Sequence, residues 1–238
     1  RLQGRIVLEK VDWTFGKSEH WAILGGNGAG KSTMLRVLAQ QIAYCEGKLR
    51  RHPELQGVTH LGWVHLNQPL SLLAQEKLKD RWEEYSGREQ EQQTIRSMFS
   101  EYMLAEKESK DLLVLMQLDS KVDRPIRGLS NGEWRKFLLF KSLIRFPKLL
   151  MLDEPFDGLD QNSSKDFKSL LRELVQHSKL SLILVSHRQD ELIPEITDVM
   201  GLRNGKMEFS GRRSAVLTEA NLKKLYKSES QASDTVDF

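Results

Sequence analysis

The sequence predicts an α/β fold in which helices cover a mainly parallel sheet. Apolar runs of strand length alternate along the chain with segments whose apolar residues recur at the helical period. The expected strands are 21–25, 149–152 and 180–185, and the expected helices are 32–42, 131–146 and 163–177. Alternation of this kind is typical of parallel sheets with helices packed on their faces.

Shorter strands are expected at both ends of this core. Apolar residues at 6–8 and 13–15 flank a charged turn and predict a pair of N-terminal antiparallel strands. Near the C-terminus, an Asn-Gly turn at 203–206 predicts a connection between two further strands.

One domain is predicted, with a helical subdomain inserted into its α/β core. The core comprises 1–69 and 147–226, the helical subdomain comprises 70–146, and 227–238 is a loose polar tail. The inserted part is charged and helix-prone, but apolar residues recur along it. We therefore expect it to be folded, with its charges on solvated helical faces.

Charge and cysteine content exclude several classes of protein. The formal net charge of +3 over 238 residues is too small to indicate general nucleic-acid binding, so no direct nucleic-acid contact is expected. The single cysteine, Cys45, excludes an internal disulfide and fits a reducing compartment. No apolar run approaches the roughly 18–20 residues that cross a bilayer. We therefore expect a cytoplasmic protein, free or peripheral at the inner face of a membrane, with any membrane subunit on a separate chain.

Residues 25–32 predict a phosphate-binding loop, because they match the pattern Gly-x-x-x-x-Gly-Lys-Ser in full. Glycines let consecutive backbone N–H groups point into one concavity, and the helix that follows directs its positive end towards the phosphates. Lys31 is expected to reach the β and γ phosphates, Ser32 to ligate Mg²⁺, and Thr33 to donate near the α-phosphate. The predicted nucleotide-binding residues are Gly25, Gly26, Asn27, Gly28, Ala29, Gly30, Lys31, Ser32 and Thr33.

Two carboxylates follow the central apolar strand, at the edge of the sheet where α/β proteins bind ligands. Asp153 is expected to hold the hydration shell of Mg²⁺, and Glu154 to orient and polarise the attacking water. His187 follows the next strand, from which it can hydrogen-bond the γ-phosphate. The Asn-Lys-x-Asp pattern of guanine recognition is absent from the sequence, which favours ATP.

With the segment Leu-Ser-Asn-Gly-Glu at 129–133, these residues make the chain similar to the ATP-binding cassette (ABC) family. Six motifs of that family occur here in its order: 25–33, Gln68, 129–133, 151–154, 158–160 and His187. The resemblance implies that Gln68 contacts Mg²⁺ and reports to the helical subdomain. It also implies that the segment at 129–133, the signature, lies at the start of a helix and completes the ATP site of a second cassette in a head-to-tail dimer.

The residues that this resemblance assigns to the partner's ATP site are Ser130, Asn131, Gly132, Glu133 and Asp160. A lone monomer is therefore expected to bind nucleotide but to hydrolyse it poorly. Within the family, the chain resembles the ModF/PhrA type, which is related to molybdenum transport or photorepair and resembles two cassettes in one chain. The segments that carry this resemblance are 19–25, 129–136 and 154–160.

Three departures from the family pattern affect these expectations. Asn131 and Glu133 replace the usual Gly and Gln of the signature, so we expect an altered affinity for phosphate. Gly26 stands where Pro is common, and no consequence is expected. Either Leu2 stands at the place of the aromatic residue that stacks on adenine, or that residue was lost at the N-terminus, and weak discrimination between bases is expected.

The sequence thus predicts an ATPase that closes a dimer on ATP, reopens it by hydrolysis and so drives a partner. The second cassette is either another copy of the chain or the other half of a tandem, and in a transporter the partner is a membrane subunit. One alternative is a soluble cassette that acts on a macromolecule in translation or repair. Another is a nucleotide sensor that does not hydrolyse ATP. Four retained residues argue against the sensor: Lys31, Asp153, Glu154 and His187.

Overall fold

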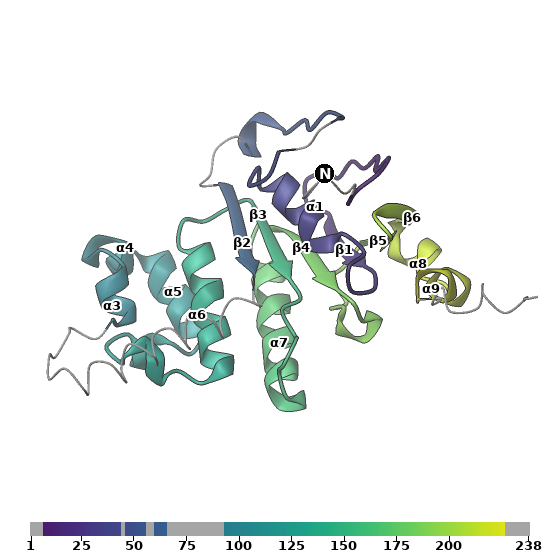
Figure 1. Cartoon of the computed structure of the whole chain (residues 1–238). Coiled ribbons are helices and arrows are strands. Elements are labelled where there is room, and N and C mark those ends of the chain that lie inside the picture. Colours follow the sequence, from purple (N-terminus) through teal and green to yellow (C-terminus); the bar gives the residue numbers. More distant parts are fainter. Residues whose placement is uncertain (1–6, 44–45, 56–59, 66–92, 227–238) are drawn as a thin grey trace, which may run out of the picture. The chain divides into compact units, whose positions relative to one another are not determined.

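The structure is a computed structural model that describes residues 7–43, 46–55, 60–65 and 93–226. The chain divides into two compact units. The first unit comprises residues 1–49 and 184–238, and the second comprises residues 50–183. Figure 1 labels the helices and strands of both units.

The described strands of the first unit include β1, β5 and β6, which lie in that order. β1 (His20–Leu24) runs parallel to β5 (Asp198–Arg203), and β5 pairs antiparallel with β6 (Lys206–Arg212). Asn204 and Gly205 connect β5 to β6 with φ angles of 48° and 76°. Two successive positive φ angles are typical of the type I′ turns of hairpins, so the predicted Asn-Gly turn is confirmed.

The α-helices in the described part of the first unit include α1 (Lys31–Leu38), α8 (Arg213–Val216) and α9 (Glu219–Tyr226). α1 follows the glycine loop, as predicted, but it ends before residue 42. Gln40 takes a left-handed backbone conformation, with a φ of 56°, which stops the helix. The sequence patterns did not predict α8 and α9.

The described strands of the second unit lie in the order β2-β3-β4. β2 (Leu61–His65) and β3 (Leu149–Asp153) pair in parallel, and the register places His65 opposite Asp153. β4 (Ser181–Ser186) begins in the second unit and ends in the first. Every residue of β3 and β4 is buried, so both predicted central strands are confirmed.

Helices make up much of the described part of the predicted subdomain, coloured teal in Figure 1: α3 (Ile95–Met98), α4 (Glu101–Ala105), α5 (Lys107–Leu115) and α6 (Asn131–Leu143). The ring of Phe99 packs edge-on against Phe137 and Phe140 of α6, with centroids 6.5 and 5.5 Å away. α6 ends three residues before the predicted 146, and Phe146, before Pro147, has a left-handed φ of 49°. Residues 70–92 of the predicted subdomain lie outside the described residues.

α7 (Gln161–His177) follows β3 and confirms the helix predicted at 163–177. It begins two residues earlier because Asp160 caps it. Its buried residues recur at helical spacing: Phe167, Leu170, Leu171, Leu174 and Val175. The helix therefore packs one apolar face inside the second unit, where it contacts α6.

The predicted strand at 13–15 does not form, and its companion at 6–8 begins outside the described residues. No strand is present between residues 7 and 19 of the described chain. Instead, the ring of Trp13 stacks on Phe15 at 5.1 Å and meets the edge of Trp21 at 5.2 Å. A pair of short strands is marginal by itself, and here contacts between rings hold the segment in place of a ladder of hydrogen bonds.

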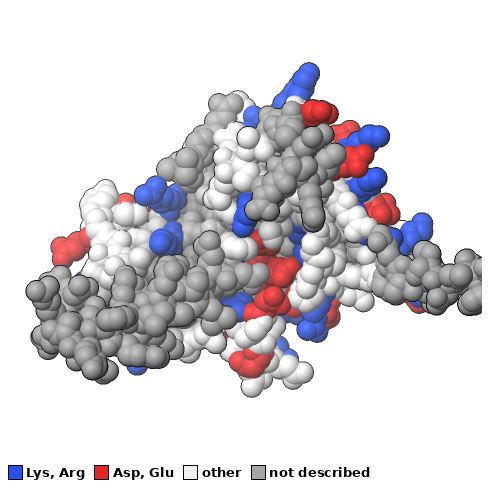
Figure 2. Space-filling model, viewed as in Figure 1, with Lys and Arg blue, Asp and Glu red and all other residues white. Residues whose placement is uncertain are grey.

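The described surface has mixed charges, as expected from the small net charge of the sequence. Figure 2 shows basic and acidic side chains interspersed among the described residues of one face. Among the described residues, no helix combines the length and apolar character that a membrane span requires.

Candidate nucleotide site

The predicted phosphate loop joins β1 to α1 in the first unit. Gly28 and Gly30 have φ angles of 77° and 101°, which other residues rarely adopt, and Gly30 is the N-cap of α1. A side chain at Gly25 would place its Cβ 2.2 Å from the carbonyl oxygen of Leu202. Gly25, Gly28 and Gly30 are therefore required for the path of this loop, and the nine predicted nucleotide-binding residues follow one another through it.

Lys31 folds back over the loop that precedes it. The residue is 4% exposed, and its Nζ donates to the carbonyl oxygens of Gly25 and Gly26 at 2.9 and 3.0 Å. Its charge is thus held at the glycine loop, beside the first turn of α1. Ser32 and Thr33 lie in that turn and are half-buried.

The turn between β5 and β6 fixes the loop from the other side. The backbone N–H of Gly205 donates to the carbonyl of Ala29 at 2.9 Å, and the N–H of Glu9 donates to the carbonyl of Gly205 at 2.8 Å. A Cβ at Gly205 would lie 2.1 Å from the carbonyl oxygen of Val7. The Asn-Gly turn therefore has a role beyond joining two strands, because it supports the phosphate loop.

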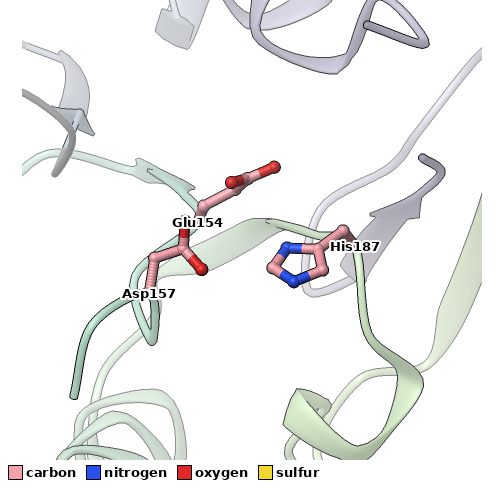
Figure 3. Close-up of side chains that lie close together, drawn as sticks. All are labelled: Glu154, Asp157 and His187. Atoms are coloured by element: carbon pink, nitrogen blue, oxygen red, sulfur yellow. The ribbon is translucent and has the colours of Figure 1, made fainter. Parts of the chain in front are cut away.

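His187 directly follows β4 (Figure 3). The loop on which it lies is held by a buried hydroxyl, that of Ser186. The Oγ of Ser186 accepts a hydrogen bond from the backbone N–H of Arg188 at 2.9 Å and also contacts a carboxylate oxygen of Glu191. Ser186 is 0% and Glu191 is 7% exposed. The position of His187 at the end of this strand is therefore well defined in the first unit.

Asp153 ends β3 in the second unit as a buried carboxylate. Its Oδ2 lies 2.8 Å from Nδ1 of His65, and its side chain is 1% exposed. The other oxygen, Oδ1, is buried without a hydrogen-bond partner among the described residues. A buried carboxylate oxygen without a partner is costly unless a ligand or water binds it. Mg²⁺ prefers oxygen ligands, so Asp153 fits the metal role predicted for it.

Glu154 and Asp157 lie on the turn that follows β3 (Figure 3). The two side chains bring carboxylate oxygens within 4.8 Å of one another, and both residues are half-buried. Glu154 has a φ of 49°, in a region that residues other than glycine seldom enter. The backbone N–H of Asp157 donates to the carbonyl of Glu154 at 3.3 Å, which closes the turn.

The guanidinium of Arg135 binds the same turn from α6. Its Nη1 donates to the carbonyl of Pro155 at 2.5 Å, and its Nη2 donates to the carbonyl of Asp157. Arg135 is 8% exposed, and this burial lowers its pKa while the charge of Asp157 opposes the shift. The turn after β3 is thus connected to α6, the helix that begins at the signature.

The signature forms the N-terminus of α6 through a capping box. The Oγ of Ser130 accepts from the backbone N–H of Glu133 at 3.2 Å, and the backbone N–H of Ser130 donates to Oε2 of Glu133 at 2.8 Å. Lys121 places its Nζ 2.6 Å from Oε1 of the same carboxylate. Lys121 and then the N–H of Ser130 lower the pKa of Glu133 to about 2. Ser130 and Asn131 are exposed, and Gly132 is half-buried.

Asp160 is the N-cap of α7. Its Oδ1 accepts from the backbone N–H groups of Asn162 and Ser163 at 2.9 and 3.0 Å, and its Oδ2 accepts from Oγ of Ser163 at 2.6 Å. The bonds to Ser163 contribute most to lowering the pKa of Asp160. The carboxylate is exposed, so it is fixed by the helix terminus and faces solvent.

Each unit thus gathers part of the predicted site. The first unit contains the phosphate loop and His187, and the second contains the signature, Asp153, Glu154 and Asp160. Gln68 lies outside the described residues, as does Leu2.

The sequence reasoning did not find His65, Lys121 or Arg135. A sequence pattern could have indicated Arg135, because it is a charged residue between the apolar Trp134 and Phe137 of a predicted helix. No sequence pattern indicated His65 or Lys121. Only the strand register brings His65 to Asp153, and only the path of the chain brings Lys121 to Glu133.

A cavity of about 630 Å³ lies elsewhere in the first unit. It is lined by Val7, Leu8, Trp13, Thr33, Val37, Leu49 and their neighbours, but by none of the residues from Gly25 to Ser32. The hollow therefore borders α1 beyond the phosphate loop, and it shares Thr33 with the predicted nucleotide-binding residues.

The sequence matches a family model and many known proteins. The model described as ABC transporter matches residues 8–157. The ABC transporter ATP-binding protein ModF of Escherichia coli K12 is 30% identical over 236 residues, which make up 96% of this chain and 46% of ModF. The uncharacterized ABC transporter ATP-binding protein C323.04 of Schizosaccharomyces pombe is 27% identical over 88% of this chain and 45% of its own length. The chain spans about half the length of these two relatives.

Relatives with other printed roles match at similar identity. The zinc import ATP-binding protein ZnuC of Magnetococcus marinus is 31% identical over 189 residues, 77% of this chain and 63% of ZnuC. Among solved structures, the ADP conformation of MJ1267, an ATP-binding cassette of an ABC transporter, has a TM-score of 0.66 at 21% identity and covers 94% of this chain and 93% of its own. The structure of cbiO1 from Clostridium perfringens has a TM-score of 0.67 at 20% identity, over 92% of this chain and 86% of its own. At these identities the two structures support the fold alone.

Proposed function

Since the chain belongs to the ABC transporter family, whose ATP-binding domains hydrolyse ATP, we propose that it is the ATPase cassette of an ATP-driven machine. It binds MgATP, pairs head to tail with a second cassette and hydrolyses ATP to move a partner. The observation that carries this proposal is the phosphate loop. Lys31 is buried against the loop carbonyls at the start of α1, where a cation and a helix N-terminus favour phosphate together.

The reacting phosphates are held by the first unit. Lys31 binds the β and γ phosphates through its charge, and Thr33 donates near the α-phosphate. His187 hydrogen-bonds the γ-phosphate. Glu154, in the second unit, orients and polarises the water that attacks, which is positioning and electrostatic work.

Magnesium fits the residues available to it. Ser32 supplies a hydroxyl, and Asp153 supplies a buried carboxylate whose Oδ1 has no hydrogen-bond partner among the described residues. The resemblance to the family implies that the side-chain amide of Gln68 is a further ligand. These are oxygen donors of the kind that Mg²⁺ prefers. When bound, the ion neutralises charge on the phosphates.

The signature of this chain completes the ATP site of the second cassette. The signature lies at the exposed N-terminus of a 13-residue helix, where backbone N–H groups and the Ser130 hydroxyl offer an anion site. Asn131 and Gly132 form the first turn with Glu133, and Asp160 caps the helix that follows β3. The second cassette is another copy of this chain or the other half of a tandem.

The partner that the cassette moves is proposed from the relatives. Identity of 30% with ModF supports a ModF-like, transport-related ATP-binding protein, of the type that the resemblance relates to molybdenum transport. The cassette then lies in the cytoplasm, peripheral to the inner face of a membrane, on a membrane subunit that is a separate chain. Fractionation of cells tests this proposal: recovery in the soluble fraction alone favours the alternative, a soluble cassette acting on a macromolecule in translation or repair.

Hydrolysis is tested by release of phosphate from ATP with and without Mg²⁺. Glu154→Gln should lower the turnover number about 100-fold or more, since general bases contribute at least that much. It should also accumulate an ATP-bound dimer, visible by size-exclusion chromatography. Glu173→Gln, at an exposed position of α7, is the matched control and should behave as wild type. Wild-type turnover by Glu154→Gln would refute the role of Glu154. Nucleotide binding and ATP-driven dimerisation without any Mg²⁺-dependent hydrolysis would favour the sensor.

A further inference from the structure

The guanidinium of Arg135 makes two hydrogen bonds that share one feature: both acceptors are backbone carbonyls of the turn after β3. Nη1 donates to Pro155 at 2.5 Å and Nη2 donates to Asp157. Pro155 directly follows Glu154, and Asp157 completes the turn. The planar fork of an arginine can bind two carbonyls at once, whereas a lysine presents one point charge.

The turn needs such support because of its backbone. Glu154 has a φ of 49°, and a residue other than glycine keeps such a conformation only where its surroundings impose it. Apart from Arg135, the buried ring of Phe156 packs edge-on against Phe167 at 5.8 Å, and the N–H of Asp157 donates to the carbonyl of Glu154. Arg135 thus ties the backbone carbonyls of Pro155 and Asp157, which follow Glu154, to α6.

A buried arginine is an expensive way to pack a helix against a turn. Arg135 is 8% exposed and has apolar neighbours in α6, Trp134 and Phe137, which are 5% and 1% exposed. Burying the charge costs free energy, and an apolar residue of similar volume is often as good for stability. Its two directed contacts therefore indicate a need for geometry rather than for stability alone.

We propose that Arg135 is a positioning residue for hydrolysis, which tethers the turn that carries Glu154 to the helix that begins at the signature. Arg135 lies five residues after Ser130, so one rigid helix contains both the signature and the tether. Helix α6 then affects two things: how the second cassette binds the signature, and where Glu154 lies. This inference rests on the proposed function, because it requires Glu154 to act on water.

Two substitutions of Arg135 separate positioning from folding. Arg135→Met keeps the length of the side chain and removes both hydrogen bonds and the charge, and Arg135→Lys keeps the charge but not the fork. Lys141→Met is the control, since it removes an exposed cation from the same helix. For each variant of the 238-residue chain we would measure the melting temperature, the affinity for a fluorescent ATP analogue with Mg²⁺, and kcat and KM for ATP.

Both Arg135 variants should bind the analogue within about twofold of wild type and keep a KM within the same range. Their kcat should fall about 10- to 100-fold, which is the usual effect of misplacing a catalytic group by a fraction of an ångström to 1 Å. Arg135→Lys should retain more activity than Arg135→Met. Wild-type kcat in Arg135→Met would overturn the inference, as would a loss of nucleotide affinity that accounts for the whole loss of activity.

A double-mutant cycle with Glu154→Gln gives a readout that a purely structural role would not change. If Arg135 acts through Glu154, Arg135→Met should lower the residual single-turnover rate of Glu154→Gln by less than about twofold, because its target is already disabled. The same fold-loss in both backgrounds would overturn the inference and leave the proposed function intact. Absence of Mg²⁺-dependent hydrolysis by a wild-type chain that does dimerise on ATP would overturn both.

Discussion

The Nδ1 atom of His65 lies 2.8 Å from Oδ2 of Asp153, at the ends of two strands that pair in parallel. The register of β2 against β3 places the two residues opposite each other, so the contact follows from the sheet and not from a flexible loop. His65 occupies one oxygen of a carboxylate that is 1% exposed. The other oxygen, Oδ1, has no hydrogen-bond partner among the described residues, which fits the metal role proposed for Asp153.

Replacement of His65 should therefore affect both stability and magnesium. His65→Phe removes the partner of a buried carboxylate oxygen, which costs about 1–3 kcal/mol of unfolding free energy. With its carboxylate less well fixed, the enzyme should also need a higher Mg²⁺ concentration for half-maximal ATP hydrolysis. Urea unfolding and a magnesium titration of the rate measure the two effects. His177→Phe, at an exposed site near the end of α7, is the control, and equal changes in both variants would contradict this role of His65.

Glu133 predicts a pH dependence of stability. Its pKa is lowered in the folded protein, from 4.5 to about 2, chiefly by Lys121 and the N–H of Ser130. A lowered pKa stabilises the fold above the unfolded value, and this contribution is lost as the pH falls through the folded value. The unfolding free energy of wild type should thus exceed that of Glu133→Gln by about 0.5–1 kcal/mol near neutral pH. The difference is modest because the ion pair of Lys121 and Glu133 is partly exposed.

The difference between wild type and Glu133→Gln should narrow as the pH falls below about 4.5 and vanish near about 2. Urea unfolding at a series of pH values measures it, with Glu173→Gln as the control at an exposed site. A difference that stays constant over this range would show that the charge of Glu133 is not what stabilises the signature.

Much of the fold could be predicted from local patterns. The run of apolar residues in β3 and the helical spacing of Phe167, Leu170 and Leu174 in α7 need no knowledge of the rest of the chain. The strand predicted at 13–15 was wrong because its apolar residues are aromatic rings that contact one another and Trp21. Periodicity cannot distinguish rings that pack together from residues that pair in a ladder.

The candidate site was predictable where one motif contains all of its parts. The phosphate loop is such a case, since Gly30 and Lys31 are neighbours in sequence and in space. The contact of His65 with Asp153 joins residues 88 positions apart, and that of Arg135 with Pro155 joins residues 20 apart. Contacts of this kind depend on strand register and helix packing, which a single sequence does not encode in any local pattern.

Gly25 and Gly26 should respond differently to the same substitution. A Cβ at Gly25 would lie 2.2 Å from the carbonyl oxygen of Leu202, while a Cβ at Gly26 meets nothing within 4 Å. Gly25→Ala should therefore destabilise the chain by about 1–3 kcal/mol, as overpacking does. Gly26→Ala should change unfolding free energy by less than about 0.5 kcal/mol, the usual size for a site without such contacts. Urea unfolding of both variants checks the contrast, and similar values would contradict the path of the loop.

Asp160 combines a structural role with the predicted role at the partner's ATP site, and two substitutions separate them. Its carboxylate accepts three hydrogen bonds at the N-terminus of α7, from Asn162 and Ser163. Asparagine caps helices about as well as aspartate, whereas alanine does not. Asp160→Asn should therefore melt within about 1 °C of wild type, and Asp160→Ala about 2–4 °C lower. If the charge of Asp160 also serves the second cassette, Asp160→Asn should lose ATP-driven dimerisation while it keeps its melting temperature. Calorimetry measures the melting temperature, and size-exclusion chromatography with ATP measures dimerisation. Full dimerisation by Asp160→Asn would show that the charge of Asp160 has no role at the second cassette and that the residue only caps α7.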